Sequence, residues 1–196
     1  MTNELRLRIG RAVATLIRLA VIIVIVLAPG ILSSGHAGEL TLAGIQSQVV
    51  RNYRDVHQME ADELAKLLRK KAEDILLLDV REPDEYGVSH LANAKRVDPG
   101  IWRSSFMQRY AKAAKGRTVV FYCSVGVRSS KLAAYVGDAL RKSGAKAVYN
   151  LKGGVFNWHN RKLPLVNAKG PTPYVHPYDQ YWGKLVERRK LTRYKP

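Results

Sequence analysis

The chain is poor in cysteine, with Cys123 as the only one among its 196 residues. One thiol excludes an intramolecular disulfide framework and any zinc site built on several thiolates. It also excludes an internal resolving thiol, so an oxidised Cys123 must react with a group outside the chain. We expect no metal site and no cofactor, because the five histidines are scattered without ligand spacing: His36, His57, His90, His159 and His176.

Acidic side chains are also scarce: 16 of them face 33 lysines and arginines, which gives a net charge of +17. Such a field attracts anions of many kinds, including small oxyanions, acidic lipids and nucleic acids. The chain has no nucleic-acid-binding motif and no basic stripe interleaved with aromatic side chains, so we expect no nucleic-acid partner. Its 46% hydrophobic and 25% charged residues are typical of a globular protein of one domain plus appendages.

Long apolar runs are confined to the N-terminus. Residues 1–18 contain four arginines, Leu19–Ala28 is apolar throughout, and Pro29-Gly30 follows. This order predicts a secretory signal peptide over residues 1–37, cleaved after Ala37. The alternative is an uncleaved anchor, and membrane contact is expected only in that case. Either way the basic end stays inside, so we expect a periplasmic or secreted protein, or one anchored to the membrane and facing the periplasm.

The rest of the chain divides by pattern. Residues 38–53 show little periodicity and are interpreted as a lead-in. Between residues 54 and 166, apolar strand-like segments alternate with helical patterns over short connections, which predicts an α/β domain with a mostly parallel central sheet and helices on both faces. The expected strands are 56–59, 75–80, 94–97, 118–122 and 147–150. The expected helices are 60–71, 101–115, 129–143 and a short one from 153, with a helical turn at 83–86.

The C-terminal tail, residues 167–196, differs in composition from the domain before it. It is rich in proline and aromatic residues and ends in a run of arginines and lysines. The aromatic residues predict that the tail packs on the domain. The basic run is interpreted as a solvated helix face.

The setting of Cys123 is the most informative local feature. The thiol follows the expected strand 118–122, and a short loop then leads into a helical pattern: Ser124, Val125, Gly126, Val127, Arg128 and Ser129. Backbone N–H groups of such a loop and a helix N-terminus favour a thiolate. Gly126 permits the turn because it tolerates positive φ. We expect these six loop residues to form the substrate-binding site, with Arg128 on an anionic donor or on the persulfide itself. Ser129 and Ser130 are expected to cap the helix. The alternative is a buried structural cysteine.

Asp79 and Arg81 end the preceding buried strand, and parallel strands place such ends at one rim of a sheet. We therefore expect them near Cys123, in a supporting role as an ion pair or loop brace below the site. Trp158 is expected to pack in the core.

Four blocks of sequence, taken in order, resemble those of single-domain rhodaneses (thiosulfate sulfurtransferases), including a secreted bacterial type. The blocks are Asp79–Tyr86, His90–Ala94, Cys123–Ser129 and Leu151–Trp158. The resemblance covers residues 54–166. It implies a three-layer rhodanese-like domain and a sulfurtransferase that moves a sulfane sulfur through a persulfide on Cys123. The implied partners are a small anionic sulfur donor (thiosulfate, persulfide or polysulfide) and a thiophilic acceptor, with a protein donor or acceptor left open.

Loop length separates this chemistry from phosphate chemistry. Arg128 follows in a Cys-x4-Arg spacing, whereas protein tyrosine phosphatases use the roomier Cys-x5-Arg, so the spacing favours sulfur. Ser89 stands where a glycine is usual, and Ser124 and Val125 are uncharged where thiosulfate-using members are often basic. The alternatives are a rhodanese-fold module that binds or delivers to a partner without turnover, and a redox-sensor thiol.

Overall fold

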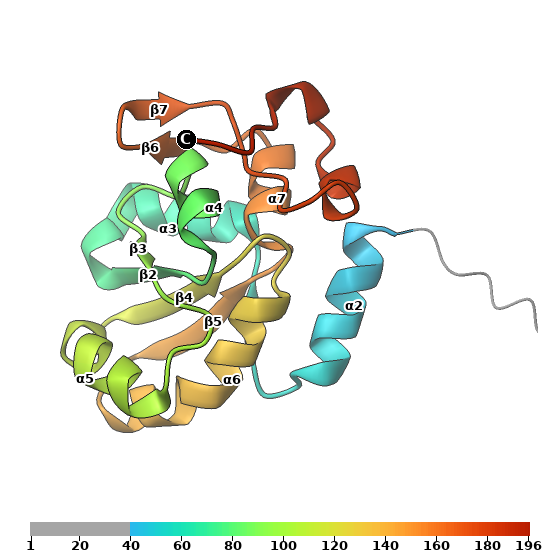
Figure 1. The fold of residues 1–196 in the computed structure, drawn as a ribbon. Coiled ribbons are helices and arrows are strands. Elements are labelled where there is room, and N and C mark those ends of the chain that lie inside the picture. The colour runs from blue at the N-terminus through green and yellow to red at the C-terminus, as the bar shows by residue number, and fades with distance from the viewer. Residues whose placement is uncertain (1–39) are drawn as a thin grey trace, which may run out of the picture. The chain divides into compact units, whose positions relative to one another are not determined.

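The computed structural model describes residues 40–196, in which five parallel strands form one sheet of order β1-β5-β4-β2-β3 (Figure 1). The expected α/β fold with a parallel central sheet is confirmed. The strands are β1 (His57–Met59), β2 (Ile75–Asp79), β3 (Lys95–Arg96), β4 (Thr118–Tyr122) and β5 (Ala147–Leu151).

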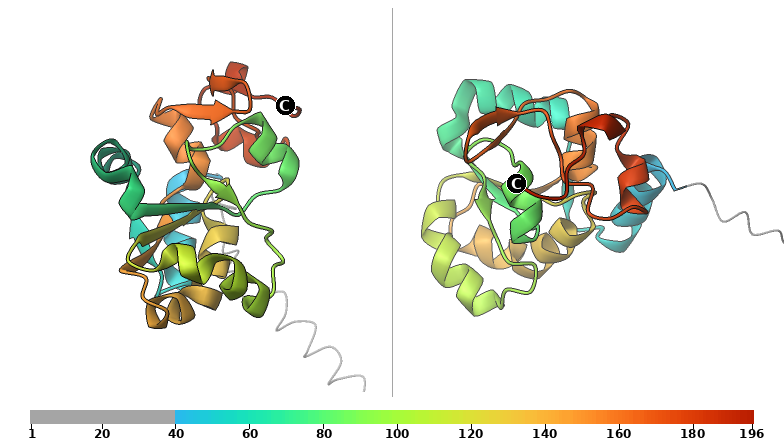
Figure 2. Two further views of the ribbon diagram at one scale, coloured as in Figure 1. Left: turned by 90° about the vertical axis from the view of Figure 1, so that its left-hand side faces the viewer. Right: turned by 45° about the horizontal axis from the view of Figure 1, so that its top comes forward.

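Helices cover both faces of this sheet, as Figures 1 and 2 show. They are α2 (Leu42–Asn52), α3 (Ala61–Lys71), α4 (Pro83–Val88), α5 (Arg103–Ala114), α6 (Val127–Lys142) and α7 (Gly154–Asn160). Alternate residues of each strand feed separate apolar cores: Leu77 packs with side chains of α2, α3 and α7, whereas Leu76 and Leu78 pack with α5 and α6. This two-sided burial explains why the strands are apolar without alternation.

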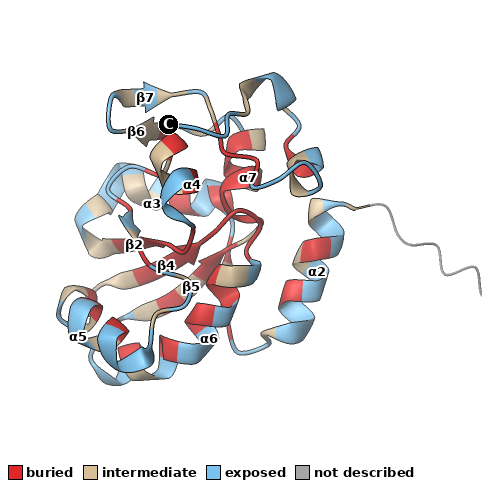
Figure 3. Cartoon of the chain, viewed as in Figure 1, coloured by how far each residue is buried: buried red, intermediate tan, exposed pale blue. Residues whose placement is uncertain are grey.

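Strand β4 lies at the centre of the sheet and is buried along most of its length (Figure 3). Val119, Val120, Phe121 and Tyr122 are all fully buried. A strand held by neighbours on both edges and both faces has little freedom to shift. It therefore fixes the position of Cys123, which follows it directly.

The lead-in is a helix, contrary to the weak periodicity seen in the sequence. Helix α2 is capped by Thr41, whose side-chain oxygen accepts the N–H of Gly44 at 3.0 Å. Only Ile45 and Val49, one turn apart, are buried, so the remaining polar positions hide the pattern. The predicted signal peptide lies outside the described residues. Within residues 40–196, no helix is both long and apolar enough to cross a membrane.

The C-terminal tail packs on the domain. An antiparallel hairpin of β6 (Leu165–Asn167) and β7 (Gly170–Thr172) leads into it. Val175 and Val186 are fully buried and Leu185 nearly so, and the carbonyl of Leu185 accepts the side-chain N–H of Asn160 in α7 at 2.9 Å. The aliphatic side chains thus provide most of the tail's buried contact.

The predicted helix in the basic run is wrong. Two short 3₁₀ turns, η2 (Trp182–Leu185) and η3 (Arg189–Leu191), are found in the tail instead, and a third, η1 (Ala72–Asp74), follows α3. Since aliphatic anchors recur only at Val175, Leu185 and Val186, the tail has no continuous apolar face that would hold a longer helix.

Candidate active site

Cys123 lies between β4 and α6 with 1% of its surface exposed. Its Sγ accepts the backbone N–H of Gly126 at 3.2 Å. Gly126 is the N-cap of α6 and adopts a left-handed conformation with φ 98°. A side chain there would be strained, and its Cβ would lie 3.1 Å from the amide nitrogen of Asn150. The loop thus places one amide on the sulfur, at the point where the first turn of α6 begins.

The predicted capping role of Ser129 and Ser130 is wrong, because α6 starts two residues earlier than expected. Gly126 occupies the cap position, and both serines lie buried in the first turn. Ser129 Oγ instead donates to Asn150 Oδ1 at 2.6 Å. Asn150 in turn donates to Gln58 Oε1 at 2.7 Å. Ser129 therefore ties α6 to β5, and through Asn150 to β1, below the cysteine loop.

Arg128 is bound by a carboxylate that the sequence did not single out. Its two terminal nitrogens donate to Glu85 Oε2 and Oε1, both at 2.7 Å, and Ser124 Oγ donates to Oε1 at 2.7 Å. The expected anionic partner of Arg128 is thus replaced here by a side chain of α4. The two residues are 43 positions apart in the chain, so no local pattern indicated the pair.

The charges of Glu85 and Arg128 stabilise each other. Burial acts to raise the pKa of Glu85, but the hydrogen bonds and charge of Arg128, together with the Ser124 hydroxyl, outweigh it and leave the pKa below its usual range. Burial acts to lower the pKa of Arg128, but the hydrogen bonds and the charge of Glu85 raise it overall. Both partners are therefore ionised at neutral pH.

A small pocket of about 130 Å³ opens beside the sulfur. It is lined by Cys123, Ser124, Val125, Val127, Arg128, Tyr178 and Trp182. The last two residues come from the C-terminal tail, which Figures 1 and 2 show in red on the same side of the domain as α4 and α7. The ring of Tyr178 lies 5.0 Å from Arg128 Cζ, a cation–π distance. Nothing in the sequence pattern indicated that the tail reaches the site.

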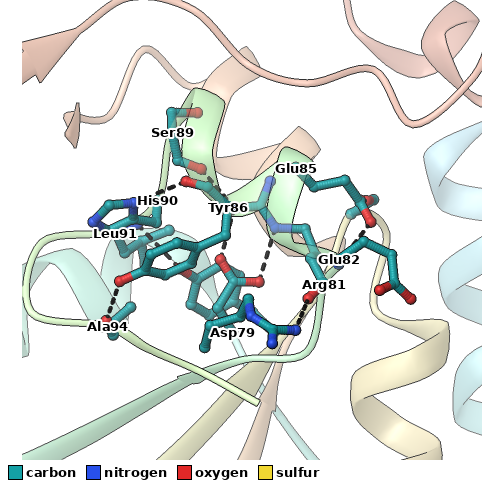
Figure 4. A network of polar contacts seen from close by, with 12 residues as sticks. Asp79, Arg81, Glu82, Glu85, Tyr86, Ser89, His90, Leu91 and Ala94 are labelled. Atoms are coloured by element: carbon teal, nitrogen blue, oxygen red, sulfur yellow. Dashed lines mark hydrogen bonds and ion pairs between the residues drawn. The ribbon is translucent and has the colours of Figure 1, made fainter. Parts of the chain in front are cut away.

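Asp79 and Arg81 form a buried ion pair (Figure 4). Neither residue lines the pocket. Arg81 Nε donates to Asp79 Oδ1 at 2.8 Å, and Nη2 donates to Oδ2 and to the carbonyl of Ser89, both at 2.6 Å. Burial acts to lower the pKa of Arg81, but Asp79 raises it overall, so the guanidinium stays charged. The pair braces the end of β2 against the segment after α4. Ser89 is extended, with φ −170°, so its position does not require glycine.

Helix α7 holds the cysteine loop from another side. The N–H groups of Val155 and Phe156 donate to the carbonyls of Cys123 and Ser124 at 2.8 and 3.0 Å. A Cβ on Gly154 would lie 2.3 Å from the Cys123 carbonyl oxygen, so only glycine allows this approach. Trp158 is buried, and its Nε1 donates to the carbonyl of Pro164 at 2.9 Å, in keeping with core packing. Between residues 40 and 196, no three histidine, cysteine, aspartate or glutamate side chains converge as a metal site.

Comparison with known proteins identifies the family. The model of the rhodanese-like domain matches residues 60–161, about half of the chain, and the chain therefore belongs to the rhodanese-like family. A sulfurtransferase of Allochromatium vinosum is 31% identical over 115 residues, which cover 59% of this chain and 99% of that protein. The thiosulfate sulfurtransferase GlpE of Coxiella burnetii is 35% identical over 107 residues, covering 54% of this chain and 87% of GlpE.

A solved structure supports the fold independently. A protein of unknown function from Rhodopseudomonas palustris, described as a possible tyrosine phosphatase, superposes with a TM-score of 0.50 and covers 66% of this chain and 97% of its own. The two are 18% identical, so this likeness concerns the fold alone. The chain is thus a single rhodanese-like domain protein related to thiosulfate sulfurtransferases.

Proposed function

We propose that the protein is a sulfurtransferase that moves a sulfane sulfur from a small donor to a thiophilic acceptor through a persulfide on Cys123. The contact of Cys123 Sγ with the Gly126 amide, at the N-terminus of α6 and beside an open pocket, is the observation that carries the proposal. Such a setting stabilises an anionic sulfur without donating a proton from an acid. A purely structural cysteine needs neither the amide nor the pocket.

The cycle has two balanced displacements. The Cys123 thiolate attacks the outer sulfur of a donor R–S–SH, the S–S bond of the donor breaks, and R–S⁻ leaves. The product is Cys123–S–SH, which loses its proton to water to give the persulfide anion. An acceptor such as cyanide then takes the outer sulfur as thiocyanate, and the Cys123 thiolate returns. No electrons are gained or lost overall, so no redox partner is required.

Hydrogen bonds from α4, α6 and α7 hold the cysteine loop in place during both displacements. The Gly126 amide is directed at the sulfur, and the Glu85–Arg128 ion pair with Ser124 fixes the far side of the loop. The carbonyls of Cys123 and Ser124 are held by α7. Because the loop is fixed before the donor arrives, little reorganisation is needed as charge moves to the outer sulfur.

The steady-state kinetics test this function. With a sulfane donor and cyanide, thiocyanate formation should show the parallel double-reciprocal lines of a ping-pong cycle, and Cys123→Ser should abolish it. Ser143→Ala, at an exposed position beyond the far end of α6, serves as the control and should retain full activity. A fully folded protein that forms no thiocyanate from any sulfane donor would instead support a binding or delivery module.

We further propose that residues 1–37 direct the protein to the periplasm. The support is the order of basic, apolar and small residues in the sequence. Sequencing the N-terminus of protein recovered from a periplasmic extract should give a chain that begins at Gly38. A chain found intact in the membrane fraction would support the anchored alternative, and a chain in the cytoplasm would refute export.

A further inference from the structure

We propose that the C-terminal tail makes the sulfur pocket selective for small organic hydropersulfides, R–S–SH, over the thiosulfate dianion, with Tyr178 and Trp182 as specificity-determining residues. This inference rests on the proposed sulfurtransferase function. It comes from three features of the described residues: an aromatic wall supplied by the tail, a pocket whose cation is already neutralised, and a small volume.

The aromatic wall is built into the fold. Tyr178 has φ 69°, a conformation that non-glycine residues rarely adopt, and its backbone N–H donates to His176 Nδ1 at 3.0 Å. The backbone N–H of Trp182 donates to Asp179 Oδ1 at 2.8 Å. Val175 is fully buried and its N–H donates to the carbonyl of Leu191 at 3.0 Å. Strained backbone of this kind persists only where its surroundings hold it, and it gathers at ligand sites.

The cationic side chain that lines the pocket already has a counter-ion. Among the described residues, Arg128 is the one basic side chain in its lining, and each terminal nitrogen of its guanidinium donates to Glu85. Tyr178 lies over the guanidinium and shields it further. The positive potential that remains comes from the Gly126 amide and the N-terminus of α6, which is equivalent to roughly half an elementary charge. That potential suits one anionic sulfur.

Counting charges separates the two donors. A thiolate and a thiosulfate dianion together bring three negative charges into the pocket, whereas a thiolate and a hydropersulfide bring two when the donor is ionised and one when it is protonated. Like charges at contact distance repel strongly where water is excluded. Thiosulfate therefore meets a higher electrostatic barrier in this pocket than a hydropersulfide does.

The volume and chemistry of the wall fit the end of a hydropersulfide. A space of about 130 Å³ corresponds to roughly four water molecules, enough for the two sulfurs and a short carbon chain. Divalent sulfur also contacts aromatic rings favourably. The two tail aromatics thus offer an apolar surface to the S–S bond and the adjoining carbon, and they offer a sulfonate group no cation.

The test measures how fast Cys123 gains sulfur in a single turnover, by quenched intact-mass measurement, with 2-hydroxyethyl hydropersulfide and with thiosulfate. The readout is the rate constant with the hydropersulfide divided by the rate constant with thiosulfate. Intrinsic donor reactivity cancels when this ratio is compared between variants. Tyr178→Leu should lower the ratio about tenfold or more, and Tyr178→Phe should keep it. Trp182→Phe should also keep the ratio and Trp182→Leu should lower it. Tyr135→Leu, at an exposed tyrosine of α6 outside the tail, is the matched control and should leave the ratio unchanged.

A charge variant separates this role of Glu85 from a merely structural one, because the two roles predict changes of opposite direction in the rate with thiosulfate. Glu85→Gln removes the charge that neutralises Arg128, so it should raise the rate with thiosulfate relative to hydropersulfide by about tenfold or more. If Tyr178→Leu, Trp182→Leu and Glu85→Gln all keep the wild-type ratio while Cys123 still loads, this inference is wrong and the sulfurtransferase proposal stands. If Cys123 loads from neither donor and not from polysulfide either, the proposed function itself fails.

Discussion

The buried ion pair beneath the site allows a sharp stability prediction. Asp79→Asn keeps the shape of the side chain but removes its charge, which leaves Arg81 fully buried without a counter-ion. The Asn amide would also place an N–H group against a guanidinium that now donates to both carboxylate oxygens. Breaking a buried pair from one side typically costs about 3–5 kcal/mol. Since domains are stable by about 5–15 kcal/mol, the variant should lose about a fifth or more of its stability.

Urea unfolding followed by circular dichroism measures this loss. Asp138→Asn is the control, because the pair of Asp138 with Arg141 is exposed and such pairs contribute under about 1 kcal/mol. The double variant Asp79→Leu/Arg81→Met leaves no buried charge, so it should be more stable than Asp79→Asn. The reasoning is refuted if Asp79→Asn costs no more than Asp138→Asn, or if the double variant is the least stable of the three.

Three further changes test the support around the loop. Gly154→Ala should lower the urea midpoint of unfolding more than Gly116→Ala does. Both positions have positive φ, but only a Cβ at residue 154 would clash, against the carbonyl of Cys123. Equal losses would contradict this reasoning. Ser129→Ala should lower stability by about 1–3 kcal/mol in thermal unfolding, since Asn150 loses a buried partner, and an unchanged midpoint would argue against that bond. Burial disfavours the charged form of His176 more than Glu85 and Asp84 favour it, so the pKa of His176 lies below 6.5. The stability that the neutral His176 ring provides is therefore complete above pH 6.5 and is lost as pH falls through its folded pKa. His176→Phe should flatten the fall in unfolding free energy between pH 7.5 and 5.5, and an unaltered slope would refute the assignment.

Much of the fold could be predicted because burial on two faces leaves a plain mark in the sequence. The run Thr118–Tyr122 is apolar without alternation because neighbouring strands and helices enclose it completely. The position of Cys123 at the carboxyl end of that strand follows from the same pattern. Asp79 and Arg81 could be paired in advance because they flank the end of the adjacent strand.

The remaining parts of the site depend on contacts that the sequence does not display. Serine has a strong preference for helix caps, yet the left-handed backbone at Gly126 starts the helix earlier and buries Ser129 in its first turn. Glu85 and Tyr178 reach Arg128 from a short helix and from the tail, and neither has a periodicity that reports a distant partner. Local propensity therefore located the candidate nucleophile, and only tertiary packing shows what surrounds it.

Intact-protein mass measurement after exposure to a sulfane donor tests the central claim most directly, because any added sulfur can only sit on the chain's single cysteine. The account predicts a gain of one sulfur atom per chain, removed by cyanide with release of thiocyanate, and no gain in Cys123→Ser. A folded wild-type protein that gains no sulfur from thiosulfate, hydropersulfide or polysulfide would contradict it.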